Sequence, residues 1–360
     1  MAGTAEQVEV PAPDGSVRSV RISSPERVMW PASASGTEVT KIELARYVAA
    51  VGDALLRAVG DRPVTLQRYP DGIDGEAFYS KNPPRGVPAW ARSVPVVYPS
   101  GRSHPQLVID EIATAVWTIQ MNTVTLHPWP VRTADLDNPD ELRIDLDPQP
   151  GRAFSDVVEA AVVLGDLLRE WGFAPFVKTS GNRGLHVFAR IAPSREFLDV
   201  RHGVIAVARE LERRIPELVT TAWWKEQRGD KIFIDYNQAC RDRTIAAAYS
   251  VRPLPGAPVS MPVRWEALRD ITPADFTVHS VPMLLDSEGD AWQPMADGGD
   301  GVIGDIERAI TAWEADVSER GLAELNFPPD YPKMPGEPPR VQPSKKNVEN
   351  WEDDGVTPKP

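Results

Sequence analysis

Two aspartates placed two residues apart are the first candidates for chemistry in this chain. Asp145 and Asp147 lie in the segment 142–148, which reads LRIDLDP. Side chains alternate along a strand, so a strand here points both carboxylates to one side and its apolar residues to the other. Close carboxylates repel unless a cation lies between them, and Mg²⁺ typically binds one or two carboxylates together with substrate phosphates. The pattern indicates a metal site for phosphoryl transfer, although an isolated Asp-x-Asp is more often a solvated strand face.

A glycine-rich turn follows about thirty residues later, in the segment 178–187, KTSGNRGLHV. Two glycines flank the turn, whose backbone N–H groups suit phosphate oxygens. Ser180 adds a hydroxyl, and Arg183 adds a guanidinium that matches phosphate geometry. His186 lies on the polar side of the next predicted strand. The segment predicts a phosphate site, and the alternative is a plain hairpin whose glycines serve only the turn.

A third segment, 228–236, supplies another carboxylate and more positive charge. Asp235 ends an apolar predicted strand, Arg228 precedes that strand, and Arg243 and Arg252 follow it. Two-metal phosphoryl transfer needs carboxylates that hold two ions roughly 3.5–4 Å apart and cations that bind a triphosphate. The three segments together contain these groups. The alternative is an exposed aspartate at a strand end with solvated arginines beyond it.

A mixed sheet covered by helices must position these groups. The order of predicted elements around the acidic strand is strand, helix, hairpin, helix, strand, which indicates an α/β fold. Ser155 is the predicted N-cap of the first helix, and Gly172 the residue that follows its last turn. The remaining predicted elements are strands 176–179, 185–191 and 232–236 and a helix over 194–214.

The residues before the acidic strand predict an N-terminal subdomain, and those after residue 326 predict a tail. The N-terminal patterns are a hairpin of strands 8–10 and 17–22, a helix over 41–59, a strand over 63–69 and a helix over 111–121. The predicted division is an N-terminal subdomain over 1–135, a catalytic core over 136–326, and an extended, acidic, proline-rich tail over 327–360.

Composition is typical of a soluble, cytoplasmic protein. Hydrophobic residues make up 42% and charged residues 25% of the 360 residues, as in ordinary globular chains. No run approaches the roughly 18 apolar residues of a membrane span, and the N-terminus lacks the pattern of a signal peptide. Cys240 is the only cysteine, which excludes an intramolecular disulfide and a cysteine-rich metal site.

The net charge of −13 argues against nucleic-acid binding, but its distribution weakens that argument. Residues 178–252 contain 14 Lys or Arg against 9 Asp or Glu, whereas residues 271–360 contain 7 against 18. The positive charge therefore surrounds the candidate chemistry. Any affinity for nucleic acid is expected to be modest and strongly dependent on salt.

Taken together, the motifs resemble a known family. DLDP, TSGNRGLHVF and KIFIDYNQACRDRTIAAAYSVR resemble the three motifs of archaeo-eukaryotic primase-polymerases, and most closely those of the polymerase domain of bacterial DNA ligase D. Upstream, SPERVMWP, RYPDGIDGEAFYSKN and LHPW are also similar to that family. The resemblance covers roughly residues 20 to 290 and implies an α/β (α+β) fold with a primase-type catalytic core, an RRM-like mixed sheet and an N-terminal subdomain.

The resemblance also implies a role for each matching residue. Asp145, Asp147 and Asp235 would hold Mn²⁺ or Mg²⁺ in a two-metal site. The residues implied in nucleotide binding are Ser180, Arg183, His186, His127, Arg228, Arg243 and Arg252. Those implied in DNA binding are Phe78 and Tyr79, which would stack on bases, Lys81 and Arg68 at the backbone, and Arg27 and Lys41. Relatives grip a 5′-phosphate with an Asn and two lysines near the N-terminus. The matching positions here are Ser24, Arg27 and Lys41, and an insertion at 32–37 lies between them.

The implied function is template-dependent nucleotide transfer in DNA repair, with a preference for ribonucleotides. Implied partners are NTP or dNTP, gapped or broken DNA, a separate DNA ligase and a Ku-type end-binding protein, with no membrane. The chain contains no Lys-x-Asp-Gly ligase motif, so we expect a stand-alone, Prim-PolC-like, monomeric polymerase at the nucleoid. The alternatives are a primase that starts chains de novo, a non-catalytic DNA-end binder and a metal-dependent nuclease.

Overall fold

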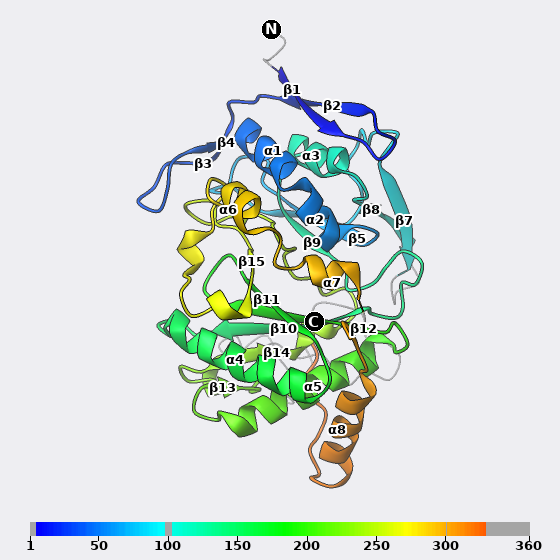
Figure 1. Ribbon diagram of the computed structural model, residues 1–360, viewed down its shortest axis with the longest axis vertical. Helices are drawn as coiled ribbons and strands as arrows, with labels where there is room; N and C mark the ends of the chain where they lie inside the picture. The colour runs from blue at the N-terminus through cyan, green and yellow to red at the C-terminus, as the bar shows by residue number, and fades with distance from the viewer. Residues whose placement is uncertain (1–4, 98–102, 300, 329–360) are drawn as a thin grey trace, which may run out of the picture.

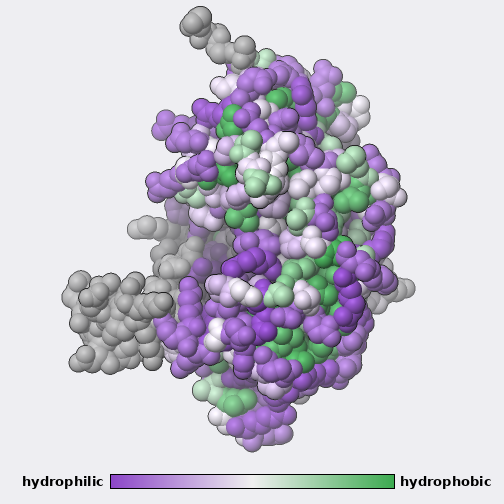
Figure 2. Space-filling view, turned by 90° about the vertical axis from the view of Figure 1, so that its left-hand side faces the viewer, coloured by the Kyte–Doolittle hydropathy of each residue, from purple (hydrophilic) through white to green (hydrophobic). Residues whose placement is uncertain are grey.

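Two large β-sheets organise the protein, one in each half of the view in Figure 1. The computed structural model describes residues 5–97, 103–299 and 301–328. Helices and strands are mixed along the chain, and the predicted α/β class is confirmed. No helix in the described part of the chain is long and apolar enough to span a bilayer. Hydrophilic residues cover most of the face shown in Figure 2, with smaller apolar patches between them.

The seven-stranded sheet contains all three chemical segments and has the order β13-β14-β10-β12-β11-β15, with β16 beside β12. The predicted acidic strand, β10, is antiparallel to both neighbours, and β11 and β12 form the predicted hairpin. Helices α4 (Phe154–Glu170) and α5 (Phe197–Arg214) pack on the lower side of the sheet (Figure 1). The strand bounds are β10 Glu141–Pro148, β11 Pro175–Thr179, β12 Leu185–Ile191, β13 Val219–Thr220, β14 Ile232–Asp235, β15 Pro262–Val263 and β16 Ile303–Gly304.

The two helices over this sheet begin differently from the prediction. Helix α4 has Ala153 at its N-cap, so the predicted capping role of Ser155 is wrong, and no side chain caps this end. Gly172 follows the C-cap with φ 87°, in the left-handed region where glycine is favoured, as predicted. Helix α5 begins at Phe197, three residues later than predicted, because Glu196 has the extended backbone of an N-cap.

The five-stranded sheet has the order β6-β5-β8-β7, with β9 on the other side of β5. The predicted helix over 41–59 is two helices, α1 (Lys41–Ala50) and α2 (Gly52–Val59). At the break Gly52 packs so closely on α3 (Ile112–Gln120) that a Cβ atom would lie 2.6 Å from the Ile112 side chain. The strand bounds are β5 Pro63–Arg68, β6 Phe78–Ser80, β7 Arg92–Val97, β8 Ser103–Val108 and β9 Thr123–Pro128. The predicted N-terminal hairpin is β1 Ala5–Pro11 with β2 Val17–Ser23, and a short pair is β3 Val28–Trp30 with β4 Val39–Thr40.

The chain that follows β14 joins the two sheets. The N–H of Ala247 donates to the carbonyl of Leu126 in β9, and Thr125 Oγ1 of the same strand donates to the carbonyl of Val251. The apolar core is continuous across both sheets. The helices after this segment are α6 (Val281–Glu288), α7 (Gln293–Asp297) and α8 (Glu307–Ser318). The boundary at 135/136 therefore stays a prediction, because later residues pack into the N-terminal half.

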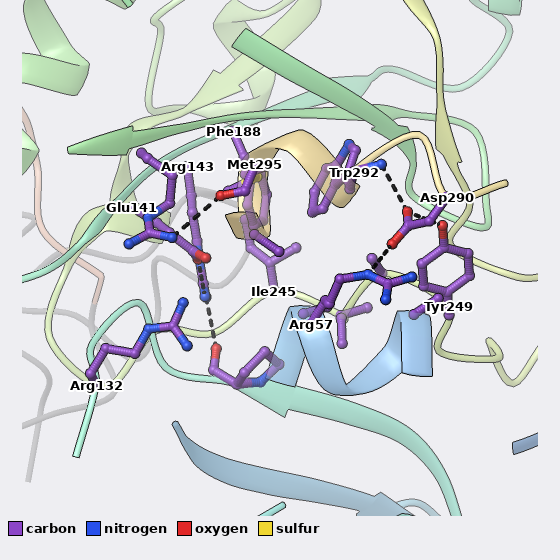
Figure 3. Close-up of a pocket in the computed structure, with 18 residues that line it drawn as sticks. Arg57, Arg132, Glu141, Arg143, Phe188, Ile245, Tyr249, Asp290, Trp292 and Met295 are labelled. Carbon is purple, nitrogen blue, oxygen red and sulfur yellow. Dashed lines mark hydrogen bonds and ion pairs between the residues drawn. The ribbon is translucent and has the colours of Figure 1, made fainter. Parts of the chain in front are cut away.

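A buried ion-pair network fixes the start of β10 against the start of β5. Arg62 is fully buried, and its guanidinium lies 2.5 Å from Asp140 Oδ1 and 2.6 Å from Glu141 Oε1. Arg132 pairs with Asp140 at 2.9 Å, and Arg143 pairs with Glu141 at 2.6 Å. Arg132, Glu141 and Arg143 line a cavity of about 20 Å³, room for roughly one water molecule (Figure 3). Since β10 carries two of the candidate carboxylates, this network positions the strand.

On the other side of that cavity a second ion pair ties α2 to the chain before α7. Arg57 Nε lies 2.7 Å from Asp290 Oδ2, and the Tyr249 hydroxyl donates to Asp290 Oδ1 at 2.5 Å (Figure 3). The predicted tail begins at Phe327, but Phe327 is only 1% exposed and belongs to the packed structure. The rest of that prediction, residues 329–360, lies outside the described residues.

Candidate active site

A row of four polar side chains crosses four neighbouring strands of the seven-stranded sheet. Asp235 is the register partner of Asp145, Asp145 of His186, and His186 of Lys178. Directly opposed residues of antiparallel strands point to the same face. The row therefore lies on the face opposite α4 and α5, and Asp147 shares this face two residues further along β10. The structure thus brings together the acidic strand, the glycine-rich turn and the third acidic residue.

The negative charges of the three carboxylates are poorly compensated by nearby positive charge. Burial, followed by the charges of Asp235 and Asp147, raises the pKa of Asp145 well above its ordinary value. Burial also raises the pKa of Asp147, against the opposing effects of Arg228 and Arg183. For Asp235 burial again raises the pKa, and hydrogen bonds from neighbouring amides oppose the rise. A cation among these oxygens would remove the repulsion.

Lys178 contacts the imidazole ring of His186. Its Nζ lies 2.6 Å from His186 Nδ1 and donates to Ser260 Oγ, also at 2.6 Å. Burial lowers the pKa of Lys178 well below its ordinary value. When Lys178 donates to Nδ1, the imidazole proton lies on Nε2, which is 3.4 Å from Asp145 Oδ1. Burial, then the charge of Lys178, lowers the pKa of His186 well below its ordinary value, so the ring is neutral. In that tautomer His186 presents an N–H to the carboxylate face.

No role for Lys178 followed from the sequence analysis, although the residue lies in the quoted glycine-rich motif. The signal that could have identified it is hairpin symmetry. Lys178 and His186 stand opposite each other across the turn, eight residues apart, on the same side of the two strands. Lys178 is fully buried, and a buried lysine almost always has partners. The alternation of side chains along the two strands therefore indicates that Lys178 and His186 lie together, but the prediction did not use it.

The glycine-rich turn is held by its own serine. Ser180 Oγ accepts hydrogen bonds from the N–H groups of Asn182 and Gly184, each at 3.1 Å. Two of the backbone donors that the sequence suggested for a phosphate are therefore already used within the turn. Gly181 has φ +70°, and a Cβ there would lie 2.4 Å from Arg252 Cγ. A Cβ on Gly184 would lie 2.4 Å from a backbone oxygen of β10. Both glycines are needed for close approach.

The arginines around the carboxylates differ in burial and in hydrogen bonding. Arg252 is largely buried, and its charge lowers the pKa of His127 and opposes the rise at Asp145. Its Nε is buried and has no hydrogen-bond partner within the described residues, which leaves a donor for an anion. Arg228 is held over the Phe233 ring at 3.6 Å and donates to the carbonyl of Trp223 at 2.8 Å. Arg183 is exposed beside Asp147, and Arg243 acts on the pKa of Asp235.

His127 in β9 is a side chain that the five-stranded sheet contributes to the site. Burial, then Arg252 and Lys178, lowers its pKa to about 3, so the ring is neutral. Its Nε2 lies 3.2 Å from Gln67 Oε1, and its ring meets the Tyr79 ring edge-on with centroids 5.9 Å apart. Tyr79 is 56% exposed, and Phe78 is 55% exposed. The site therefore lies between the two sheets, with aromatic side chains at its outer side.

The remaining predicted DNA contacts differ in accessibility. Arg68 stacks over Phe78 at 5.8 Å while its Nε donates to a backbone carbonyl at 2.7 Å, and Lys81 is partly exposed at the end of β6. Arg27 is exposed and donates to the carbonyl of Pro70. Lys41 is 3% exposed, its Nζ donates to the carbonyl of a residue in α3 at 2.9 Å, and burial lowers its pKa to about 8. Lys41 is thus not placed to contact DNA in this conformation.

The donor set fits a divalent cation that also binds phosphate. Across residues 5–97, 103–299 and 301–328, no three His, Cys, Asp or Glu side chains converge in a preformed metal cluster. Mg²⁺ rarely uses such an all-protein cage and instead combines one or two carboxylates with substrate phosphates and water. The paired carboxylates of Asp145 and Asp235, with Asp147 beside them, match this requirement.

Comparison with known proteins agrees with this arrangement. Residues 40–292 match the family described as "LigD, primase-polymerase domain". The chain is 36% identical over 282 residues to the multifunctional non-homologous end joining protein LigD of Pseudomonas aeruginosa, covering 77% of this chain and 33% of that protein. It is 31% identical over 252 residues to the bifunctional LigD of Bacillus subtilis, covering 69% and 40%. The chain spans about a third of the length of the first curated relatives that it matches.

A solved structure has the same fold. The polymerase domain from Mycobacterium tuberculosis Ligase D, in complex with DNA, superimposes with a TM-score of 0.69 at 28% identity, covering 77% of this chain and 97% of that one. The fold that the motifs implied is therefore confirmed. The family match covers the five-stranded sheet, the seven-stranded sheet except β16, and every residue of the polar row. On these grounds the chain belongs to the LigD primase-polymerase domain family.

Proposed function

We propose that this protein is a template-dependent nucleotidyltransferase that fills short gaps or extends broken ends in DNA repair. The observation that carries the proposal is the row of Asp235, Asp145, His186 and Lys178 on one sheet face, beside the unsatisfied donor of Arg252. Carboxylates for divalent cations and a donor for phosphate meet there, as nucleotide transfer requires. The similar LigD proteins are named for non-homologous end joining, which supports the repair setting.

In the proposed reaction the primer 3′-oxygen attacks the α-phosphorus of a nucleoside triphosphate. A new O–P bond forms, the bond to the β-phosphate oxygen breaks, and pyrophosphate leaves. Asp145, Asp147 and Asp235 would hold one or two Mn²⁺ or Mg²⁺ ions, which when bound lower the pKa of the attacking hydroxyl and neutralise charge on the leaving group. The protein groups orient both substrates.

The chain's own donors would bind the triphosphate. Arg252 and Arg228 lie beside the carboxylates, and exposed Arg183 extends the positive charge toward solvent. With Lys178 as the donor to Nδ1, His186 would contribute an Nε2–H, which suits a phosphate oxygen. Ser180 would act mainly through the shape of its turn, with Arg243 near Asp235. His127, neutral and beside exposed Tyr79, would contact the nucleotide sugar.

The exposed aromatic residues are the proposed DNA contacts. Stacking of Phe78 and Tyr79 on bases would contribute about 1–3 kcal/mol per base. Arg68, Lys81 and Arg27 would contact the backbone. We further propose a preference for ribonucleotides and cooperation with a separate DNA ligase and a Ku-type protein at the nucleoid. With a net charge of −13, DNA affinity is expected to fall steeply as salt increases.

Primer extension on a short-gapped DNA in Mn²⁺ tests the proposal, with ribonucleotides and deoxyribonucleotides compared and EDTA as the control. We expect templated extension that EDTA abolishes. Products from an unprimed template would favour a primase, and metal-dependent loss of a labelled primer without nucleotide would favour a nuclease. Gapped DNA that is bound but never extended would indicate an end-binding module.

Lys178→Met is expected to lower kcat/KM for the nucleotide by about 100-fold. The variant keeps the buried volume but removes the donor to His186 Nδ1, so the imidazole proton is no longer fixed on Nε2. Ser260→Ala, which removes the other partner of Lys178, is expected to change kcat/KM in the same direction by about tenfold. A folded Lys178→Met protein with lower thermal stability but unchanged kcat/KM would show that the lysine is only structural.

A further inference from the structure

The chain after α8 returns to the turn that follows β14. We call residues 321–327 the C-terminal strap. Helix α8 packs along α5 (Figure 1), and the strap continues from it to the end of α5 that lies nearest the Asp235 turn. The strap lies beyond residues 40–292, the part that matches the family. Its contacts are therefore a feature of this chain that the family match does not cover.

One fully buried arginine of α5 anchors the strap. Arg201 Nη1 lies 2.7 Å from Glu324 Oε1, and its Nη2 donates to the carbonyls of Leu325 at 2.9 Å and Asn326 at 3.1 Å. The same guanidinium lies 3.7 Å from the centre of the Phe327 ring. Four consecutive strap residues, 324–327, thus compensate or contact one buried positive charge.

The same arginine also reaches the turn that carries Asp235. Arg201 Nε donates to Asn237 Oδ1 at 3.1 Å, and Asn237 Nδ2 donates to the carbonyl of Asn326 at 3.0 Å. The backbone N–H of Asn237 then donates to Asp235 Oδ1 at 3.0 Å. Gln238 Nε2 holds the other carboxylate oxygen, also at 3.0 Å. Asn237 is therefore fixed by α5 and the strap on one side and orients the carboxylate on the other.

A second contact keeps Glu324 in place. His202 Nε2 lies 2.5 Å from Glu324 Oε2, and the His202 ring stacks on Trp313 of α8 at 3.7 Å and 10°. Burial alone would raise the pKa of Glu324, but the hydrogen bond from His202 and the charge of Arg201 lower the pKa to about 2. Glu324 is thus ionised at neutral pH and remains an anion for Arg201.

We propose that the C-terminal strap is a positioning element that orients the Asp235 carboxylate for cation binding through Arg201 and Asn237. This inference rests on the proposed function, because it assigns Asp235 to a divalent cation. Groups that hold a ligand side chain in place typically contribute 10–100-fold to metal affinity. If the strap detaches, Asn237 loses its Asn326 partner and Arg201 loses its anion, so the turn can rotate and the carboxylate loses its fixed direction.

The test uses the full chain with the strap weakened by the double substitution Glu324→Ala/Phe327→Ala. The matched control is Glu307→Ala, which removes an ion pair of α8 with Arg195 at 2.6 Å that is exposed and does not contact Arg201. Melting temperature is measured in EDTA and then across a Mn²⁺ titration, followed by primer extension at saturating Mn²⁺. We expect the Mn²⁺ midpoint of the strap variant to rise about tenfold, with the control unchanged and extension largely recovered at high Mn²⁺.

The outcomes separate this inference from the proposed function. A strap variant that is less stable in EDTA but has the wild-type Mn²⁺ midpoint would overturn the positioning role. If the double variant does not fold, Glu324→Gln takes its place, because it keeps the shape and removes only the charge. Its midpoint is expected to rise about threefold, and an unchanged midpoint would again overturn the inference. A wild-type chain with no Mn²⁺ response and no extension would overturn the proposed function itself, and the inference with it.

Discussion

Asp145→Asn is expected to abolish primer extension while making the metal-free protein more resistant to heat. Asparagine keeps the shape of Asp145 but removes the anion that the cation needs, so we expect extension to fall by at least about 1,000-fold. In EDTA the melting temperature is expected to rise by about 2–4 °C. Burial and the neighbouring carboxylates disfavour the charged form of Asp145, and the substitution removes that repulsion.

The pH dependence of this stability difference has a definite sign. The pKa of Asp145 is raised in the folded state, so the folded protein binds this proton more tightly than the unfolded chain does. Stability is therefore lost as the pH rises from the ordinary carboxyl pKa through the raised one. In EDTA the advantage of Asp145→Asn should therefore grow as the pH rises above the ordinary carboxyl pKa.

A surface aspartate provides the control for this variant. Asp156 lies in the first turn of α4 and pairs with Arg152 at 3.3 Å. Asp156→Asn should change neither extension nor the Mn²⁺ response. Extension that survives in Asp145→Asn would show that the metal assignment is wrong, and an unchanged melting temperature in EDTA would refute the account of the buried charge.

Arg62→Ala is expected to lower the free energy of unfolding by about 3–5 kcal/mol. Arg62 is fully buried and binds Asp140 at 2.5 Å and Glu141 at 2.6 Å. Its removal leaves two buried carboxylates with less compensation, which costs far more than a surface ion pair contributes. Urea denaturation measures the change, with the variant and the wild type compared at similar dependence of the unfolding free energy on urea concentration.

Arg92 offers a matched control for Arg62. It also binds two carboxylates, Asp61 at 2.8 Å and Asp110 at 2.7 Å, but its side chain is 45% exposed. Arg92→Ala should therefore lower stability by less than about 1 kcal/mol. Equal losses for the two arginines would mean that burial of the Arg62 network has no special energetic weight.

The sequence carried most of the information about the polar row because that information is local. The alternation around Asp145 and Asp147, the two glycines and the apolar run before Asp235 each indicate a strand and its facing side. The hairpin of β11 and β12 and the order of helices and longer strands along the chain from β10 to β14 follow from the same patterns. The order of strands within the sheet was not predicted. The strands that period-two alternation predicts are present in the structure.

The parts that were not predicted depend on distant contacts. Arg201 lies more than 120 residues from its strap partners, and no local pattern marks such a pair. Lys41 was assigned to DNA through the family resemblance, as a position where relatives grip a 5′-phosphate, yet it is buried against the end of α3. The break at Val51 arises from the close approach of Gly52 to Ile112. Tertiary packing decided each of these features over local propensity.

The outer strands of the seven-stranded sheet have a consequence for behaviour in concentrated solution. Its path ends in β13 on one side and β15 on the other, and each is only two residues long. Residue Pro262 of β15 has no N–H to offer. Exposed, long strand edges are the usual templates for intermolecular pairing, and short edges with proline are a recognised protection. A second molecule that approaches either side of this sheet therefore finds almost no ladder to extend, which disfavours aggregation by strand addition.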